Sequence, residues 1–440
     1  MKPYSSGLYC FSDDLRVNDN PALTLAQQQC QQLSYCYIID KTALSRGRYG
    51  IPALGKHRLN FILQSLDQLQ ATLSQQGHSL AVYLGEPLEI LTALVSQYRF
   101  DAVFSAQQAG IYENRRWQKL QDRFRFLNFH QVSNFTLFNE TRLPVKLDQL
   151  PTTFSQFRKR LEPLSDTLPA AHTAAPEFSH HPLMLPSHQN LPQIDRSLNT
   201  LMHGGEQSAQ QHLQSYFASH APHHYKETRN ALEDFSSSTK LSAYLARGNL
   251  SPQQVVNAVR AYEQQHGENE STYWIVFELL WREYFYWYLK RYQEKVFSFK
   301  GLASQKPQTS FYPSRFKHWC EGKTPYPLVN ACMKQLNSTG YLSNRGRQIV
   351  ASCLVHELSV DWRYGAAYFE QQLVDYDVAA NWGNWQYIAG VGADPRGGRR
   401  FNIDKQAKIY DPENDFINRW RGADISAVDH VDAADWPTLS

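Results

Sequence analysis

Short runs of β-branched and aromatic residues alternate with helical patterns over the first third of the chain. Between them, residues 57–73 repeat apolar positions at the three- and four-residue spacing of an amphipathic helix, and Pro87 begins another helix. This alternation predicts parallel strands joined by crossover helices, an arrangement in which nucleotide-like ligands favour the carboxyl ends of the strands. The expected strands are 8–11, 34–39, 80–84, 102–105 and a weaker one at 126–132.

The pattern changes after residue 164. Between 164 and 193 the chain has five prolines and four histidines, His172, His180, His181 and His188. Their irregular spacing favours a solvated connector over a metal site. From about residue 199 the helical period dominates and strand signals fade. We therefore expect an α/β domain with a parallel, Rossmann-like sheet at 1–135, an inter-domain linker at 136–200 and an all-helical domain at 201–440.

Composition narrows the class of protein. The 440 residues are 42% hydrophobic and 13% aromatic, as in a globular protein. The net charge of +3 is too small for the whole surface to bind a polyanion, so any nucleic-acid binding must be local. The six cysteines form no C-x-x-C pair, which argues against a zinc site or a disulfide framework, and no apolar run reaches membrane-spanning length. We expect a cytoplasmic monomer that binds no metal and no membrane.

The stretch 341–387 carries the most informative polar pattern. An apolar helical run follows Ser343-Asn344-Arg345-Gly346-Arg347, so guanidinium and amide groups stand where a helix begins, the end that attracts anions. Asp375 and Asp377 place two carboxylates on one side of an extended segment, and 381–387 mixes amides with aromatic rings. Such a mixture suits a planar ligand with polar edges.

Two further segments offer chemistry. The serine- and threonine-rich stretch 236–242 precedes a helix and offers hydroxyls and free N–H groups to phosphate, although an ordinary helix cap has the same composition. The helix at 274–292 carries Glu278, Trp281, Arg282 and Phe285 on one face. The carboxylate and guanidinium of that set are equally consistent with a surface ion pair one helical turn apart.

Several strings in this region resemble the flavin site of the photolyase/cryptochrome family, in the same order and at the same spacing. They are Gly340-Tyr341-Leu342-Ser343-Asn344-Arg345, Asp361-Trp362-Arg363, Asp375-x-Asp377-x-Ala379-x-Asn381 and Gly383-x-Trp385-Gln386. Gln348, Tyr387 and the segments 392–396 and 399–402 are most similar to the DASH branch of that family. The stretch 11–23 is similar to the family's amino-terminal signature, but its Asp and Asn residues also suit turns and helix caps. The resemblance covers nearly the whole chain.

The resemblance implies that the helical domain binds FAD, and the lack of a Rossmann glycine fingerprint is consistent with a flavin held by helices. Arg347 would lie near the isoalloxazine and Asn381 would face flavin N5. Glu113 lies near the family's site for the antenna 5,10-methenyltetrahydrofolate. The implied FAD-binding residues are Tyr225, Ser238, Thr239, Lys240, Leu241, Ser242, Glu278, Arg282, Asn344, Arg347, Asp375, Asp377 and Asn381.

The resemblance also implies a substrate, DNA that contains cyclobutane pyrimidine dimers. Glu278 and Asn344 would hydrogen-bond the dimer, and Trp281 would line its pocket. Gln348 and Tyr387 replace a methionine and a tryptophan of the photolyases that act on duplexes, which fits the DASH preference for single strands. Ser343-Asn344 replaces the histidine pair of the six-four enzymes, so six-four repair is not expected. A basic rim would contact phosphates, or these side chains form ordinary solvated faces: Arg229, Arg345, Arg396, Arg399, Arg400, Lys405 and Lys408.

Trp385, Trp362 and Trp319 match the three indoles of the family's photoreduction chain, although core tryptophans with no redox role would look the same in sequence. Together these features predict a photolyase of the DASH type, driven by blue light, that splits cyclobutane dimers in single-stranded DNA. Glu278, Asn344 and the three tryptophans would be its catalytic residues. The leading alternative is a light sensor that signals through a protein or nucleic-acid partner. A dark flavin oxidoreductase is disfavoured, because the sequence contains no nicotinamide fingerprint.

Overall fold

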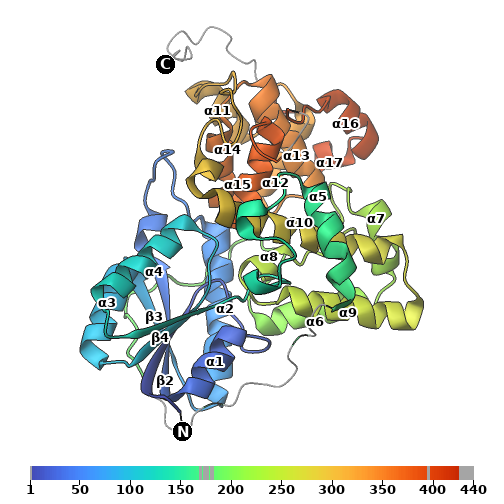
Figure 1. The fold of residues 1–440 in the computed structure, drawn as a ribbon. Coiled ribbons are helices and arrows are strands. Elements are labelled where there is room, and N and C mark those ends of the chain that lie inside the picture. Colours follow the sequence, from blue (N-terminus) through green and yellow to red (C-terminus); the bar gives the residue numbers. More distant parts are fainter. Residues whose placement is uncertain (1, 168–170, 172–177, 179–182, 394–396, 426–440) are drawn as a thin grey trace.

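The computed structural model describes residues 2–167, 171, 178, 183–393 and 397–425. Its amino-terminal part is built on one sheet of five parallel strands in the order β3-β2-β1-β4-β5 (Figure 1). The order reverses between β1 and β4, the place where open α/β sheets bind ligands. The strands are β1 (Tyr4–Phe11), β2 (Cys30–Asp40), β3 (Leu80–Gly85), β4 (Ala102–Ala106) and β5 (Asn128–Val132).

Both faces of the sheet are covered, because alternate residues of β1 enter two different hydrophobic cores. Tyr9 and Phe11 pack with helices α1 (Pro21–Gln29) and α2 (Lys56–Gln75) on one face. Leu8 and Cys10 pack with α3 (Pro87–Tyr98) and α4 (Ile111–Arg123) on the other. A strand buried on both faces reads as a continuous apolar run, which is why β1 is evident in the sequence.

The sequence prediction of a parallel α/β unit followed by helices is confirmed. The weakest predicted strand, 126–132, begins later than expected, at Asn128. Phe126 has 78% of its surface exposed, and Leu127 turns into the core before the strand starts. Apolar residues at a strand entrance therefore extended the predicted element by two positions.

After residue 199, the described part of the chain contains helices and a single isolated strand-like bridge between Ser310 and Val360. This helical part surrounds one large hydrophobic core. Its helices are α6 (Glu206–Phe217), α7 (Tyr225–Thr228), α8 (Ser242–Ala246), α9 (Pro252–His266), α10 (Glu270–Tyr292), α11 (Pro313–Glu321), α12 (Pro327–Thr339), α13 (Asn344–Ser352), α14 (Trp362–Gln372), α15 (Val378–Ala389), α16 (Ile403–Tyr410) and α17 (Asp415–Arg419).

The first part of the predicted linker 136–200 is packed rather than loose. It contains α5 (Phe154–Leu161), whose Phe154, Phe157 and Leu161 are buried in the core of the helical part. The chain after the predicted boundary at 135 is therefore packed structure rather than a loose linker. The two predicted domain boundaries, at 135 and 200, stay predictions. Part of the segment rich in proline and histidine, including His172, His180 and His181, lies outside the described residues.

A buried arginine joins the α/β part to the helical part. Arg16, 1% exposed, donates to the carbonyl oxygens of Gly248 at 3.0 Å and Asp19 at 2.8 Å, and to Asn134 Oδ1 at 2.6 Å. From the helical part, Asn249 Nδ2 donates to the Leu15 carbonyl at 2.9 Å. The stretch 11–23 thus has a structural role at this junction, in addition to its likeness to the family signature.

Helix α10 runs through the middle of the helical part and is buried along most of its length. A capping box at Asn269 and Thr272 begins it. Glu283, 1% exposed, accepts hydrogen bonds from the backbone N–H of Leu137 at 2.8 Å and Phe138 at 3.3 Å, and from Trp287 Nε1 at 2.8 Å. Burial raises the pKa of this carboxyl to about 7. One side chain thereby fixes the 137–138 segment against the helix.

We expect Glu283→Ala to lower the free energy of unfolding by about 3 kcal/mol, because buried N–H donors without an acceptor cost roughly 1–3 kcal/mol each. Urea denaturation followed by circular dichroism measures the change. Glu89→Ala, on the exposed face of α3, is the control and should stay within about 0.5 kcal/mol of wild type. Equal midpoints for the Glu283 variant and the control would contradict the structural role of Glu283.

Candidate flavin and substrate site

Two cavities adjoin in the helical part and share one wall. The polar cavity has a volume of about 260 Å³. Hydroxyl and charged side chains line it, among them Ser238, Lys240 and Asp375. The aromatic cavity, of about 440 Å³, is lined by rings that include Trp274, Trp281 and Trp385. The residues that line both are Arg229, Glu278, Arg282, Asn344, Arg347, Asp375, Asp377 and Ala380.

The polar cavity brings together most of the residues expected to bind a flavin. Asn381 lies on the wall of the aromatic cavity instead, and Glu113 lines a third cavity in the α/β part. The expected residues found in the polar cavity are Tyr225, Ser238, Thr239, Lys240, Leu241, Ser242, Glu278, Arg282, Asn344, Arg347, Asp375 and Asp377. Residues up to 152 positions apart in sequence, Tyr225 and Asp377, therefore line one cavity.

Lys240 is the buried cation of this cavity. It is 7% exposed and has a φ of 51°, in the left-handed region, so the chain turns sharply there before α8 begins. Its Nζ donates to Ser238 Oγ at 2.8 Å. Burial lowers the pKa of Lys240 to about 8. An anion beside Lys240 would stabilise the charged form of this buried ammonium. The stretch 238–242 is therefore suited to hold a diphosphate.

An ion pair fixes the opposite wall. Arg347 Nη2 donates to both carboxylate oxygens of Asp375, at 2.9 and 2.8 Å, and Arg347 Nε donates to the Leu342 carbonyl at 2.8 Å. Asp375 is 6% exposed, and this pairing offsets the cost of burying its charge. The guanidinium therefore stays where α13 and the 373–377 loop meet, facing both cavities.

Arg282 and Asp377 form a second, weaker pair at 3.6 Å. Arg282 also donates to the carbonyl oxygens of Phe135 and, at 3.3 Å, Leu245. Asp377 caps α15 by accepting from the Ala380 N–H at 2.9 Å. The Glu278 and Arg282 side chains are thus cavity residues with separate partners rather than an ion pair with each other.

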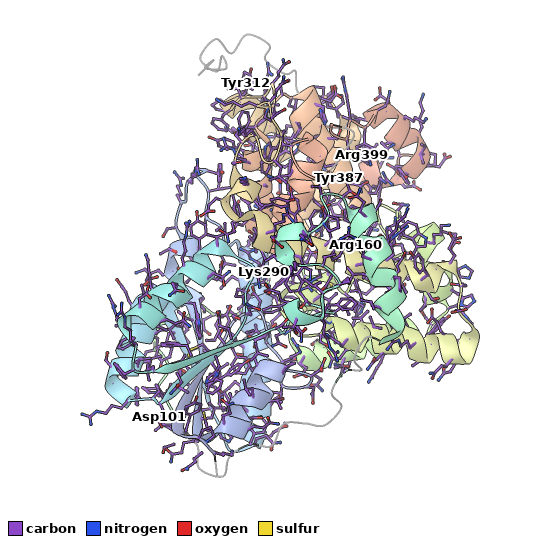
Figure 2. All side chains as sticks on the ribbon, in the orientation of Figure 1. Asp101, Arg160, Lys290, Tyr312, Tyr387 and Arg399 are labelled. Carbon is purple, nitrogen blue, oxygen red and sulfur yellow. The ribbon has the colours of Figure 1, made fainter. Side chains whose placement is uncertain are left out.

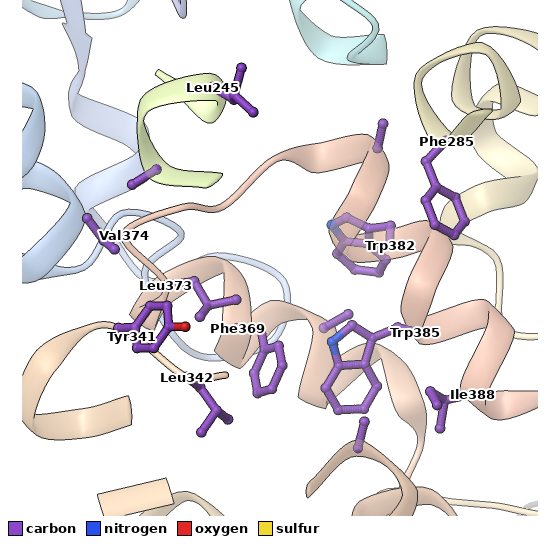
Figure 3. Packing of buried hydrophobic residues seen from close by; sticks show 14 of the residues in the cluster. Leu245, Phe285, Tyr341, Leu342, Phe369, Leu373, Val374, Trp382, Trp385 and Ile388 are labelled. Carbon is purple, nitrogen blue, oxygen red and sulfur yellow. The ribbon is translucent and has the colours of Figure 1, made fainter. Parts of the chain in front are cut away.

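Small residues let aromatic rings approach the helices. A Cβ atom at Gly365 would overlap the Trp385 indole, and one at Gly383 would overlap the Phe285 ring. Figure 3 shows Trp382 and Trp385 along the inner side of α15, with Phe369 beside Trp385. Asn381 is held there by a 3.0 Å hydrogen bond from its Nδ2 to the Ala366 carbonyl. These contacts set the back wall of the aromatic cavity.

Glu278 lies between the two cavities in an ion pair with Arg229. Burial raises the pKa of Glu278, and the nearby Arg229 opposes that shift. The Arg229 guanidinium also lies 4.4 Å from the centre of the Trp274 ring. Trp274 was not among the predicted site residues. The one signal for Trp274 was its place on the Glu278 helix, one turn before that residue.

Trp281, Tyr387 and Gln348 all line the aromatic cavity. The Trp281 ring stacks on Phe154 of α5, with ring centres 3.7 Å apart, and meets Tyr387 edge-on at 6.0 Å. The sequence did not predict that α5 packs against a residue of this cavity, because α5 lies within the predicted linker. The three predicted substrate contacts are therefore neighbours in the structure.

The predicted basic rim is only partly assembled. Arg399 donates to the Tyr387 hydroxyl, and the two residues lie together in Figure 2. Arg345 does not line either cavity: it donates to Asn230 Oδ1 at 3.0 Å, and its guanidinium lies 4.9 Å from the Tyr410 ring centre. Arg400 pairs with Glu357 on an exposed surface. Arg396 lies outside the described residues.

A third cavity, the sheet-end cavity of about 500 Å³, lies at the carboxyl ends of β1, β2 and β4. Glu113, in the first turn of α4, lines it. Residues of the helical part close its other side, among them Tyr376 and Trp382. Arg247 forms an ion pair with Asp13 across this junction. The sequence placed ligands at the strand ends in general but gave no sign of Trp382, because its neighbours come from a distant part of the chain.

The three predicted redox tryptophans are placed as follows. Trp385 is 2% exposed and lines the aromatic cavity, whereas Trp362 and Trp319 are fully buried. Trp362 Nε1 donates to the Phe299 carbonyl at 3.0 Å. Trp319 packs edge-on against Trp385, with ring centres 6.2 Å apart. Trp319 therefore lies beside Trp385 rather than beyond Trp362.

Comparison with known families assigns the two parts of the chain. Residues 7–177 match the DNA photolyase family, and residues 274–431 match the FAD binding domain of DNA photolyase. The sequence is also 55% identical to a cryptochrome DASH of Idiomarina loihiensis, over 99% of this chain and 97% of that protein. The chain belongs to the photolyase/cryptochrome family. The match to the FAD binding domain supports FAD as the cofactor, and the polar cavity is the candidate FAD cavity.

Within the family, the relatives named cryptochrome DASH include one from Vibrio parahaemolyticus, 47% identical over 98% of this chain and 97% of that protein. The crystal structure of a Synechocystis cryptochrome has a TM-score of 0.88 at 34% identity, covering 96% of this chain and 89% of that one. A bacterial class III photolyase from Agrobacterium tumefaciens has a TM-score of 0.78 at 28% identity, covering 94% and 86%. The predicted family and two-part fold are confirmed.

The described residues contain neither a membrane-spanning helix nor a cluster of metal ligands. Among those residues, no helix is both long enough and apolar enough to cross a membrane. In the same part of the chain, no three His, Cys, Asp or Glu side chains are grouped so that they could hold a metal ion.

FAD affinity should fall as pH rises above about 8, by up to about tenfold per pH unit, because each unit of pKa corresponds to one factor of ten. Below that pH Lys240 is already charged; above it, the lysine must take up a proton to meet the diphosphate. Titration of apoprotein with FAD from pH 6.5 to 9.5, followed by flavin fluorescence, measures this. The dependence should vanish in Lys240→Met and persist in the exposed control Lys405→Met. A constant affinity up to pH 9.5 would contradict the role of Lys240.

Proposed function

We propose that this protein is a photolyase of the DASH type that uses blue light and FAD to split cyclobutane pyrimidine dimers, preferentially in single-stranded DNA. One observation carries the proposal: Glu278 and Asn344 line both the FAD cavity and the aromatic cavity beside it. A dimer in the aromatic cavity would therefore contact the same two side chains as the flavin. We propose that it acts as a cytoplasmic monomer.

The reaction divides between cofactor and protein. Reduced FAD, when bound and excited by light, supplies the electron that opens the dimer ring and takes it back afterwards. The protein's residues hold the dimer and stabilise the charge that it carries in between. Burial raises the pKa of Glu278 against the opposing effect of Arg229, and so favours the protonated carboxyl, the form that would donate a hydrogen bond to a dimer carbonyl oxygen. Asn344 offers its amide to the same substrate from the start of α13, where free N–H groups also favour negative charge.

Two groups act on the cofactor's charge. Arg347, held by Asp375, keeps a positive charge beside the place of the ring system, which favours a reduced and anionic flavin. Asn381 contributes a neutral amide rather than a carboxylate to the same wall, so it adds no opposing negative charge. Both effects favour the redox state that repair requires.

The preference for single strands follows from two residues that line the aromatic cavity, Gln348 and Tyr387. Gln348 and Tyr387 are more polar than the methionine and tryptophan of duplex-acting enzymes and give an extruded dimer less apolar contact. Arg399 holds the Tyr387 hydroxyl and orients the ring toward Trp281. Extruding a dimer from a duplex costs a few kcal/mol that a single strand does not require. Arg229 and Arg399 supply positive charge for the flanking phosphates, as we propose for Arg345 and Arg396.

We further propose that the sheet-end cavity holds the antenna 5,10-methenyltetrahydrofolate. Its volume of about 500 Å³ falls within the range of small-molecule sites. Glu113 stands in its wall and offers a carboxylate to a pterin edge. The position between the sheet and α15 brings an occupant close to the FAD cavity.

A light sensor that signals through a partner remains the second candidate, because several relatives bear the name cryptochrome. Turnover separates the two functions. The purified protein, with its flavin reduced, should restore thymine absorbance to dimer-containing oligothymidylate under blue light. Light-dependent flavin chemistry with no restored absorbance would favour the sensor.

Glu278→Ala should lower the yield of dimer splitting by about a hundred- to a thousandfold at most, since losing one preorganised donor typically costs roughly 2.7–4 kcal/mol at its largest. FAD occupancy should change less, because many other groups line the FAD cavity. Repair per absorbed photon, normalised to bound flavin, is the measurement. The exposed control Glu268→Ala should repair as wild type does. Unchanged repair in the Glu278 variant would remove Glu278 from the reaction.

Repair of one dimer should be roughly a hundredfold faster in a single strand than in an intact duplex at limiting enzyme, because a few kcal/mol of unpairing cost corresponds to that factor. The comparison uses matched single-strand, bubble and duplex oligonucleotides at fixed salt, since phosphate binding depends on salt. The double substitution Gln348→Met and Tyr387→Trp should narrow the gap. Equal wild-type rates in all three substrates would refute the single-strand preference.

A further inference from the structure

The tryptophans expected to deliver electrons to the flavin are sealed inside the protein. Trp362 and Trp319 have no exposed surface, and Trp385 is 2% exposed and faces a cavity. Electron transfer weakens steeply with distance, so a reductant in solution needs a redox-active side chain nearer the surface. The outer end of the path must therefore lie beyond these three residues.

Trp319 is not that end. Its indole N–H donates to the Val350 carbonyl at 2.9 Å, and the side chain has no exposed surface. Two of its ring neighbours, Tyr368 and Phe369, are themselves buried. Trp319 therefore forms an inner branch beside Trp385.

Trp362 and Trp385 meet along the contact between α14 and α15. Gly365 follows Trp362 by three residues, so both lie on the same side of α14. The Trp385 indole packs against Gly365 so closely that a side chain there would overlap it. Trp362 then contacts Trp382 of α15 edge-on, with ring centres 5.8 Å apart. Trp382, Trp362 and Trp385 thus form a line along which an electron can pass, joined by a ring contact at one step and by the approach of Trp385 to Gly365 at the other.

The line continues outward to a pair of tyrosines. The Trp382 ring centre is 6.1 Å from that of Tyr49, and the Tyr49 ring centre is 5.2 Å from that of Tyr364. Tyr49 comes from an exposed turn of the α/β part, and Tyr364 from α14. Both tyrosines are half-buried and so reach solvent. Phe311 stacks on Tyr364 at 3.9 Å, but its ring has no hydroxyl proton to lose on oxidation.

We propose that Tyr49 and Tyr364 are the terminal electron donors of flavin photoreduction, on a path that runs from the tyrosine pair through Trp382, Trp362 and Trp385. The inference rests on the proposed function, because it requires a flavin that light reduces in this protein.

Photoreduction takes one electron and one proton from a tyrosine. One electron leaves a tyrosine, and each indole on the path refills the next, so that the flavin gains a single electron. The oxidised tyrosine releases its phenolic proton to water, which its half-buried hydroxyl can reach. A thiol in solution then returns a hydrogen atom to the phenoxyl oxygen and is itself oxidised.

The charges around the pair suit this chemistry. Burial raises the pKa of Tyr49 and of Tyr364, so both phenols are protonated near neutral pH and carry a proton to release. The Arg48 guanidinium lies 5.8 Å from the Tyr49 ring centre, and Arg363 carries a second positive charge nearby. These cations disfavour a positively charged ring and so favour loss of the proton on oxidation. Asp361, the carboxylate of this cluster, is paired with Arg363.

The test compares the FAD-loaded wild type with the double variant Tyr49→Phe and Tyr364→Phe under blue light and a thiol reductant. Phenylalanine keeps both rings and removes the oxidisable hydroxyls. Photoreduction should slow by about tenfold or more, equivalent to at least about 1.4 kcal/mol in barrier. In the wild type, a nitroso spin trap followed by peptide mass mapping should mark Tyr49 or Tyr364. Tyr368→Phe, which removes a buried phenol beside Trp319, is the matched control and should behave as wild type.

Separate outcomes test the inference and the proposed function. Wild-type photoreduction in the double variant, or a trapped radical on Tyr368 or Tyr312, would overturn the inference. Without antenna pigment, dimer repair with chemically reduced flavin should be unchanged in the double variant, because repair does not use the path and Tyr49 lines the sheet-end cavity rather than the FAD or aromatic cavity. If even Trp385→Phe photoreduces at the wild-type rate, the proposed photochemistry fails as a whole. Flavin absorbance confirms that each variant is folded, and Trp382→Phe interrupts the same path if the double variant loses its flavin.

Discussion

Helix α10 can be buried along most of its length because its polar side chains find partners. Glu283 accepts three N–H groups, Arg282 donates to carbonyls of two other segments, and Glu278 pairs with Arg229. Removing one partner from a buried charge typically costs about 3–5 kcal/mol. The segments that supply these partners, at 135–138, 229 and 245, are therefore held in fixed positions around the helix. The FAD cavity and the aromatic cavity are the spaces left between them.

The two cavities act as one site because the same charged side chains join the surrounding segments and face both cavities. Glu278, Arg282, Arg347 and Asp375 each stabilise a contact between segments and also face a cavity. A buried ion pair is oriented by its partner, so these groups need little reorganisation when a ligand arrives. The arrangement also means that a substitution there affects folding and ligand binding together. Measurements on such variants need bound flavin as a reference.

The sequence predicted those features that depend on local pattern or on motifs. Alternating apolar runs located the strands, and the motifs near 238–242, 341–347 and 375–385 brought the FAD cavity together. It could not predict contacts between distant segments. Arg345 of α13 packs on Tyr410 of α16, and Trp319 of α11 packs edge-on against Trp385 of α15. The contact between Tyr49 and Trp382 joins the two parts of the chain and has no local signal at all.

Helix α15 separates the sheet-end cavity from the aromatic cavity, with Trp382 in one wall and Trp385 and Asn381 in the other. Its one exposed position, Asn384, itself lines the aromatic cavity. Substitutions on any side of this helix therefore change the lining of a cavity or a buried contact. A random library over 378–389 should contain very few neutral substitutions, and insertions should be the least tolerated, because one added residue would rotate every later side chain of the helix by about 100° about its axis.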